Sequence, residues 1–241
     1  MSLLGLAQNV LDEVGLPRLT NVFASTDVTA RRLKQLANRA GKRLAKSHPW
    51  TALHVEHLIT VVASTVEFGF PDDFHRFLPG THWDRTNTWQ QQGPLTPSEW
   101  QLLKSGGIAA GIRVRWRVKR GESTLKSVFA IDSTLGGSTA ATLVFEYVST
   151  RWCRTSDGTV NSAWTADTDL ALFDEELIEL DLIWRLQKSL GMDYAEDKIT
   201  ADRAIDMAWA QDGGAPKLSI HGSIVRRRGM LWPKIPESGF G

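Results

Sequence analysis

The stretch of residues 170–190 constrains the fold of this chain more than any other feature of its sequence. Its apolar residues recur at helical spacing and cover more than half of the helix circumference, so we expect a helix that is buried on several sides. Acidic residues crowd the first turns while Arg185 and Lys188 come late, which is the polarity that the backbone dipole favours. Gly191 supplies a C-terminal stop. The pattern predicts a central helix about 30 Å long, against which other helices pack.

Two of these other helices are predicted at opposite ends of the chain. Residues 2–14 form one apolar face, with Ser2 as the N-cap and Gly15 as the stop. A last helix is expected over residues 194–211. Its predicted apolar positions are Ile199, Ala204, Ile205, Ala208 and Trp209.

A further helix is predicted over residues 27–46, with Ser25 or Thr26 as its N-cap. Its predicted inward positions are Val28, Leu33, Leu36, Ala37, Ala40 and Leu44. Its outer face is basic and carries Arg31, Arg32, Lys34, Arg39, Lys42, Arg43 and Lys46. A basic face of this kind indicates a nucleic acid or an acidic protein partner, although a merely solvated face has the same pattern.

The basic helix complements the central helix, whose first turns are acidic. We predict a subunit interface in which these two faces meet, formed by Arg31, Arg32, Lys34, Arg39, Glu175, Glu176, Glu179 and Asp181. A second interpretation stays open, namely a nucleic-acid-binding regulator that uses residues 27–46. Binding of that kind would weaken as salt is added, because the phosphate contacts release counterions.

Between the helices the sequence changes to a pattern rich in Val, Ile and Thr, which indicates strands. Strands are predicted at residues 54–70, 112–118, 126–131 and 141–148, with a loop or short irregular strands at residues 81–94. Thr96 and Glu99 form a capping box that opens a short helix. Asp157 and Gly158 are a hairpin-turn signal, which would pair residues 151–154 with residues 159–164.

The order of helices, then strands, then helices predicts an α+β fold. Residues 1–52 and 166–214 would form a discontinuous antiparallel helical bundle, and residues 53–165 an inserted antiparallel β domain. Residues 215–241 show no regular period and are predicted to form an extended C-terminal tail.

Catalytic, cofactor and metal sites are not predicted. A single cysteine, Cys153, cannot form an internal disulfide or a cysteine-based zinc site, and favours a reducing cytosol. His54 and His57 have a metal-ligand spacing only on a helix, and the local pattern is that of a strand. The acidic pairs Asp72–Asp73 and Asp167–Asp169 lie in turn-like sequence, where Asp is favoured for local hydrogen bonds. Phosphate-loop and nucleophile-elbow patterns are lacking, as are a signal peptide and an apolar run of membrane-spanning length.

Several segments together resemble a known family by their order and spacing. They are residues 36–39, 48–53, 70–74, 83–85, 93–100, 145–149 and 177–194. The set is similar to the head-to-tail adaptors of tailed bacteriophages, the group that includes the tail tubular protein A type of short-tailed phages. The resemblance covers nearly the whole chain, from Ser2 to about Gly214.

The resemblance implies a structural virion protein, not an enzyme, with a helical body and an inserted β domain. It implies a ring, usually a dodecamer, that docks beneath the portal protein and continues the DNA channel. Genomic DNA would pass without sequence-specific contacts, and a downstream tail protein would attach to the ring. Assembly would take place in the host cytoplasm, with no membrane involved.

Two further partner predictions concern the loops and the tail. Residues 121–123 and 135–138 are short, polar, glycine-rich loops, and the β domain is therefore expected to face the downstream tail protein. The tail is predicted to bind the portal protein through Arg226, Arg227, Arg228, Leu231, Trp232, Ile235 and Phe240. Trp232 and Leu231 would anchor it, and the arginines would meet portal carboxylates.

Overall fold

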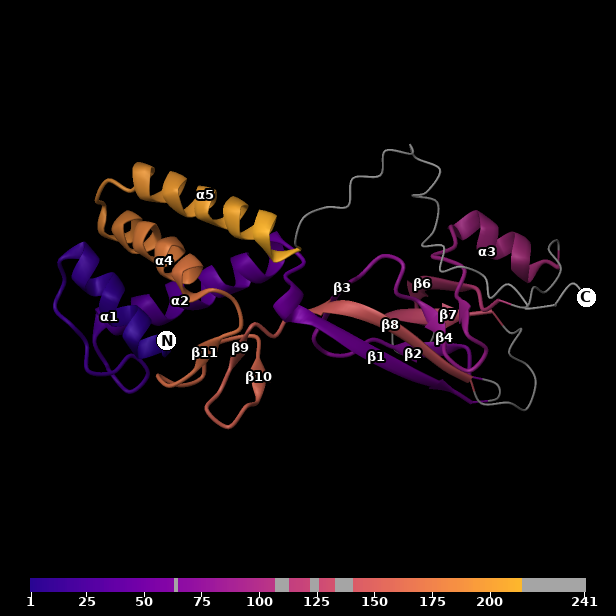
Figure 1. Cartoon of the computed structure of the whole chain (residues 1–241). Coiled ribbons are helices and arrows are strands. Elements are labelled where there is room, and N and C mark those ends of the chain that lie inside the picture. Colours follow the sequence, from indigo (N-terminus) through magenta and orange to yellow (C-terminus); the bar gives the residue numbers. More distant parts are fainter. Residues whose placement is uncertain (63–64, 107–112, 122–125, 133–140, 214–241) are drawn as a thin grey trace, which may run out of the picture.

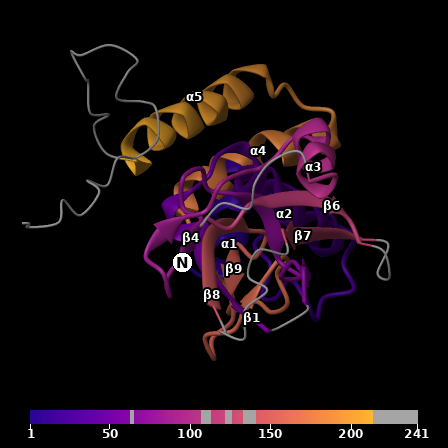
Figure 2. The ribbon, with the colours of Figure 1, turned by 90° about the vertical axis from the view of Figure 1, so that its right-hand side faces the viewer.

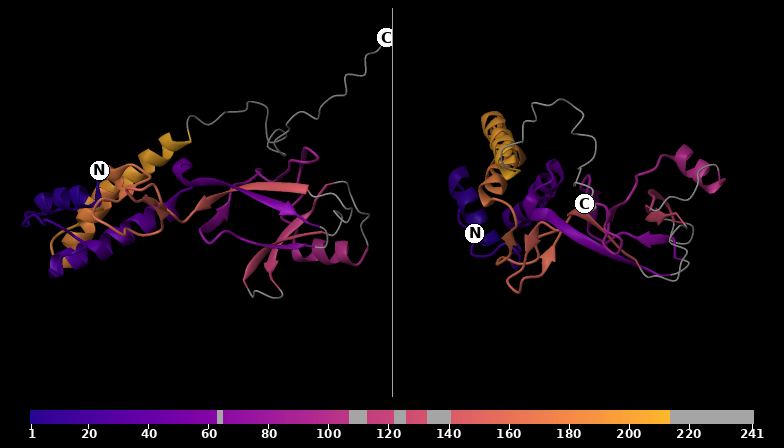
Figure 3. Two further views of the ribbon diagram at one scale, coloured as in Figure 1. Left: turned by 90° about the horizontal axis from the view of Figure 1, so that it is seen from below. Right: turned by 45° about the vertical axis from the view of Figure 1, so that its right-hand side comes forward.

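A computed structural model describes residues 1–62, 65–106, 113–121, 126–132 and 141–213 of the chain. Most helices gather at one end of an elongated molecule and most strands at the other (Figure 1; Figure 3). The helical end contains α1 (Leu3–Val14), α2 (Val28–Ser47), α4 (Glu175–Leu190) and α5 (Ala195–Asp212). The combination of helices with antiparallel sheets confirms the predicted α+β class.

The predicted N-cap is confirmed at α1 and is wrong at α2. Ser2 caps α1 by accepting a hydrogen bond from the Gly5 amide, and Gly15 ends it with a positive φ of 74°, as predicted. Helix α2 is capped by Asp27, not by Ser25 or Thr26, since the Asp27 carboxylate accepts from the Thr29 amide at 2.6 Å. Val28 was predicted to face inward, but it is 61% exposed because it lies in the first turn, ahead of the packed part of the helix.

The central helix begins later than the sequence predicts. Asp174 caps α4, and Gly191 ends it at φ 77°, but residues 170–174 are not helical. Leu170–Ala171 instead forms strand β11, which pairs with β9 (Cys153–Arg154). With 16 residues, α4 is about 24 Å long. The strand pairing removes these residues from the helix, because a long-range backbone partner outweighs their local helical pattern.

Helix α4 contacts α1, α2 and α5. The shared core, which we call the helical cluster, includes Leu6, Val10, Leu33, Ala37, Leu44, Trp152, Cys153, Trp164, Leu177, Ile178, Leu182 and Leu186. Trp152, fully buried, directly precedes β9 of the three-stranded sheet β10-β9-β11, in which β10 is Val160–Asn161. The hairpin of β9 and β10 at Asp157–Gly158 is confirmed, and its flanking tryptophans pack among the helices.

Helix α5 packs with only part of its surface. Ala201 and Ile205 are buried against the helical cluster, as predicted for Ile205. Ile199 and Trp209 were predicted to be inward positions, but they are 51% and 56% exposed. They lie on the solvent side because α5 covers α4 from one side only (Figure 1).

The strand-rich end, viewed from that side in Figure 2, holds two antiparallel sheets. Their strands are β1 (His54–Val61), β2 (Glu67–Gly69), β3 (Phe74–Phe77), β4 (Trp83–Asp84), β5 (Trp89–Gln90), β6 (Trp116–Arg120), β7 (Ser127–Ile131) and β8 (Ala141–Ser149). One sheet has the order β1-β8-β4-β5, with β3 also paired to β8, and the other has the order β2-β7-β6. The two sheets form a β sandwich over a second core, the sandwich cluster, made by Ile59, Val61, Val114, Trp116, Phe129, Ile131, Ala141, Leu143, Phe145 and Tyr147.

Several local predictions for this part are confirmed. Helix α3 (Pro97–Lys104) begins with the capping box of Thr96 and Glu99. The predicted strand at residues 112–118 is shorter at its start, since β6 begins at Trp116. Residue 112 lies outside the described residues. The domain limits at residues 52 and 166 stay a prediction, and Trp152 and Trp164 belong to the helical cluster.

Candidate interaction surfaces

The buried carboxylate of Asp181 on α4 binds Arg43 of α2, and Arg43 extends this network to α5. Asp181 is fully buried, and it binds Arg43 of α2, the Arg185 Nε atom at 2.7 Å and the Trp184 Nε1 atom at 2.9 Å. Arg43 also binds Asp202 of α5 at 2.5 Å. The sequence predicts Asp181 in a subunit interface, whereas its carboxylate binds residues within the subunit. Arg185 and Trp184 are near neighbours of Asp181 in the sequence, but Arg43 comes from a different helix, so the burial of Asp181 could not be predicted from α4 alone.

The basic side of α2 forms a groove with the β9–β10 hairpin. The groove has a volume of about 490 Å³ and is lined by Arg31, Lys34, Gln35, Asn38, Arg39, Lys42 and Ala163. The Asn38 side-chain oxygen accepts from the Trp164 amide at 2.9 Å, which fixes the hairpin as the groove wall. A carboxylate is not among these lining residues, and the predicted interface cations Arg31, Arg32, Lys34 and Arg39 make no ion pair with any described residue. The groove therefore suits an anionic partner.

The predicted acidic residues lie on another side of the helical end. Glu175 binds the N-terminal amine of Met1, and Glu179 accepts from Asn9 of α1 at 3.4 Å. Glu176 is exposed in the first turn of α4. These residues therefore face the α1 side, whereas the groove is built from α2 and the hairpin. The structure does not bring the two predicted charge sets together within one subunit.

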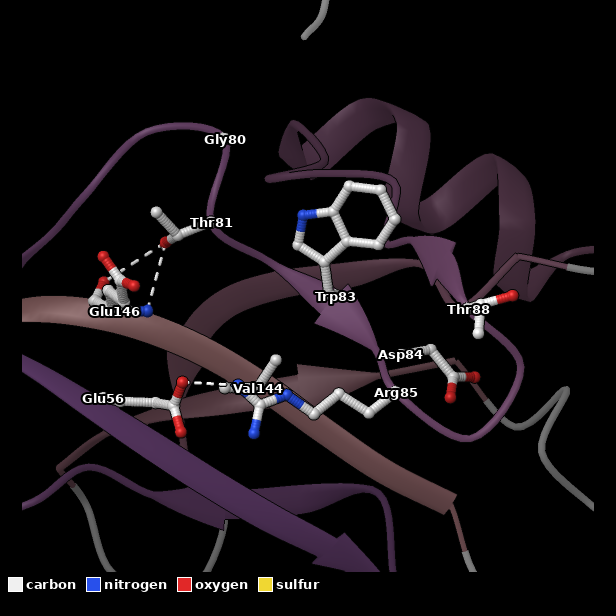
Figure 4. Close-up of a pocket in the computed structure, with 9 residues that line it drawn as sticks. All are labelled: Glu56, Gly80, Thr81, Trp83, Asp84, Arg85, Thr88, Val144 and Glu146. Carbon is white, nitrogen blue, oxygen red and sulfur yellow. Dashed lines mark hydrogen bonds and ion pairs between the residues drawn. The ribbon is translucent and has the colours of Figure 1, made fainter. Parts of the chain in front are cut away.

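A hollow of about 460 Å³ lies on the outer face of the five-stranded sheet (Figure 4). Val144 of β8 forms its floor, and the Trp83 indole of β4 stands at its side. Arg85 reaches across to an ion pair with Glu56 of β1. The hydroxyl of Thr81 accepts from the Glu146 amide at 3.1 Å, which holds the neighbouring loop on β8. Sequence reasoning missed this site, because it depends on how three strands distant in sequence align.

Asp169 makes the local hydrogen bonds that its turn-like sequence predicts, whereas Asp73 and Asp167 accept hydrogen bonds from residues distant in the sequence. Asp73 accepts from the Tyr147 hydroxyl at 2.9 Å and from the Ser149 hydroxyl at 2.6 Å. Burial alone would raise the pKa of Asp73, but the hydrogen bonds from Ser149 and Tyr147 hold that pKa below its usual value. Asp167 binds the amides of residues 22 and 23, and Asp169 binds those of residues 165 and 166.

The two histidines of the sequence pattern lie on strand β1 and do not meet. The His54 ring contacts the Pro49 carbonyl at 3.1 Å, and the His57 ring packs 5.2 Å from that of Phe145. Across the described ranges of the chain, three His, Cys, Asp or Glu side chains nowhere converge as metal ligands would. In the same ranges, we find no helix with the length and apolarity that a bilayer requires.

The predicted portal-binding residues lie outside the described residues. They are Arg226, Arg227, Arg228, Leu231, Trp232, Ile235 and Phe240. The same holds for most of the predicted tail-side loops, since residues 122–123 and 135–138 are not described. All of these stay predictions.

Separate, oppositely charged faces on one subunit suit a protein that assembles with other proteins. More particularly, residues 1–216 match the family model described as SU10 adaptor protein, and the chain belongs to this family of phage head–tail adaptors. Membership makes it a structural component of a phage virion that contacts other head and tail proteins, in a generally non-enzymatic family. The narrower likeness to the tail tubular protein A type stays a prediction. No curated protein matches the chain.

Proposed function

We propose that this protein is the adaptor that forms a dodecameric ring beneath the portal protein and continues the DNA channel. The ring would serve as the attachment platform for a downstream tail protein. The observation that supports this function is the separation of the unpaired basic groove on α2 from the acidic residues at the start of α4.

A closed ring of identical subunits needs an interface in which one face meets a different face of the neighbour. Arg31, Lys34 and Arg39 of the groove, together with Arg32 beside them on α2, would meet Glu175, Glu176 and Glu179 of the adjacent copy. Because the two sets lie on different sides of one subunit, each copy can use both at once. Asp181 is left out of this interface, since it is fully buried.

The portal contact is assigned to the C-terminal tail, with Trp232 and Leu231 as anchors and Arg226 to Arg228 facing portal carboxylates. The tail follows α5, whose last residue, Asp212, accepts from the Thr51 amide at 2.8 Å. Thr51 begins the short 3₁₀ helix η1 (Thr51–Leu53), which leads into β1. Helix α5 therefore ends at the junction between the helical end and the β sandwich. In this proposal the tail would leave from that junction, and the β sandwich would face the downstream tail protein.

The same groove supports a second candidate function, a regulator that binds nucleic acid through residues 27–46. A groove lined by four cations and no carboxylate also suits phosphates. The two functions differ in what they need. A regulator would bind free duplex DNA as a monomer or dimer with strong salt dependence. An adaptor gains little from tight phosphate contacts, because DNA must slide through it.

Mass measurement and negative-stain imaging of the purified protein, with and without portal protein, test the proposal. Rings that bind the portal are expected. Reversing Arg32 and Arg39 to Glu should weaken ring formation, while the matched reversal of Lys198 and Arg203, exposed on α5, should leave it intact. Rings that assemble normally from Arg32→Glu/Arg39→Glu protein but fail to retain DNA would assign the groove to DNA instead.

A further inference from the structure

The two outer faces of the β sandwich differ in charge. In the five-stranded sheet, His57 and Phe145 are register partners on the inner side, so their neighbours Glu56 and Glu146, also partners, point outward. In the three-stranded sheet, Trp116 points inward to the sandwich cluster, so Arg117 points outward. One face therefore presents carboxylates, and the opposite face presents a guanidinium.

The acidic face contains the hollow of Figure 4, whose chemistry suits a cation. Its floor, Val144, is apolar, and the Trp83 indole offers a ring face at its side. Glu56 is already paired with Arg85, whereas the Glu146 carboxylate makes no ion pair with a described residue. An aromatic ring beside an unpaired carboxylate is a favourable site for an arginine side chain, which stacks on the ring and binds the carboxylate at its edge.

The basic face carries a cation, Arg117, that suits this role. Lys119 of β6 is engaged by Glu67 of β2. Arg117, on the same strand, is half-buried and has no carboxylate partner in the described part of the chain. Its register partner on β7 is Ala130, a small residue that is itself buried.

We propose that in the ring the hollow of each copy receives Arg117 of the neighbouring copy, so that the β sandwiches form a second interface beside that of the helices. The inference rests on the ring proposed above. A second copy is the occupant because the complementary faces lie on opposite sides of one sandwich, as a head-to-tail ring requires. The Arg117 guanidinium stacks on Trp83 and binds Glu146, with Val144 beneath it.

Charge reversal in the full-length chain tests this pairing. We expect Glu146→Arg and Arg117→Glu each to raise the concentration at which rings form by on the order of tenfold. The double variant should restore assembly, because the two charges are exchanged and the pair is kept. Arg120→Glu, at the end of the same strand β6, is the matched control and should leave assembly unchanged. Ring formation is followed by sedimentation and native mass measurement, with thermal unfolding to show that each variant folds.

The outcomes separate this inference from the ring itself. If the wild-type protein and both single variants all form rings equally well, the sandwich contact is wrong, but the proposed adaptor function is unaffected. A double variant that assembles no better than the single variants would overturn the pairing of Arg117 with Glu146. Glu146→Arg rings that form normally but no longer attach the downstream tail protein would assign the hollow to that protein. If the wild-type protein forms no rings, even with portal protein, the proposed adaptor function is wrong, and the sandwich contact that rests on it is wrong as well.

Discussion

The helical cluster and the sandwich cluster accommodate buried polar side chains by opposite means. The helical cluster surrounds the Asp181 carboxylate with Arg43, Arg185 and the Trp184 indole. The sandwich cluster holds the His82 ring 4.1 Å from that of Trp116, and its Nε2 atom has no hydrogen-bond partner among the described residues. The helical end therefore depends on compensation of charge, and the strand-rich end on keeping a titratable group neutral. We therefore expect loss of a charged partner to destabilise the helical end, and protonation to destabilise the strand-rich end.

The largest effect is expected from Asp181→Ala, which leaves two arginines without their shared carboxylate. Removing one partner of a buried ion pair costs about 3 kcal/mol or more of unfolding free energy. Asp202→Ala is the control, since its side chain is 43% exposed and such pairs contribute less than about 1 kcal/mol. Urea unfolding measures both, and equal losses would contradict the view that burial makes Asp181 the more important partner.

The next effect concerns packing at the point where α2 approaches the hairpin most closely. A Cβ atom on Gly41 would lie 2.2 Å from the Trp152 ring, so Gly41→Ala must displace the indole. We expect a loss of about 2 kcal/mol, measured by thermal unfolding. Gly69→Ala in the β sandwich is the control, because nothing lies within 4 Å of its Cβ position. If Gly41→Ala is as stable as the wild type, the Trp152 indole can move aside without loss of stability, and the prediction is wrong.

Acid should weaken the sandwich through His82. Burial lowers the pKa of His82 to about 4. Between pH 6.5 and 4 the unfolded chain binds a proton that the folded chain does not, so stability falls as the pH is lowered through this window and then levels off. The expected loss is about 2 kcal/mol by pH 4.5.

His82→Phe isolates this contribution, since phenylalanine retains the stacking but cannot titrate. The pKa values of His48, His57 and His75 are also lowered, chiefly by burial, so part of the acid sensitivity should persist in the variant. The difference between wild type and variant across pH is the measured quantity. Parallel pH profiles would show that His82 does not contribute.

The smallest effect is expected at the capping box of α3. Thr96→Ala removes the hydroxyl that accepts from the Glu99 amide, at a cost of about 1 kcal/mol. Ser2→Ala provides the counterpart at the helical end, because Ser2 caps α1 alone, without a reciprocal glutamate. Hydrogen exchange of the first-turn amides should show the larger local loss for Thr96→Ala. The reverse order would mean that α3 is held by packing of the buried Trp100 instead of its cap.

Much of the fold could be predicted because local chemistry fixes it. The stops at Gly15 and Gly191, the capping box at Thr96 and the turn at Asp157–Gly158 all act within a few residues. The cap of α2 was missed by one residue because Ser25, Thr26 and Asp27 are consecutive cap formers, and the local pattern does not rank them.

The interaction surfaces were harder to predict, because they depend on contacts between distant parts of the chain. The basic groove was recognised from α2 alone, but its hairpin wall, held by Asn38 and Trp164, was not. The burial of Asp181 follows from Arg43, which lies on a different helix. The hollow beside Trp83 exists only once β4 and β8 are in register.

The ladder of β1 and β8 ends inside the helical end of the molecule. Val148, which pairs with His54, is fully buried in the helical cluster, as are Trp50 and Leu53 on the chain that enters β1. Because one end of this strand pair is buried in the helical cluster, the pair connects the β sandwich rigidly to the helical end. If a tail protein attaches to the sandwich as proposed, a torque that it applies would pass into the helical cluster of α2 and α4.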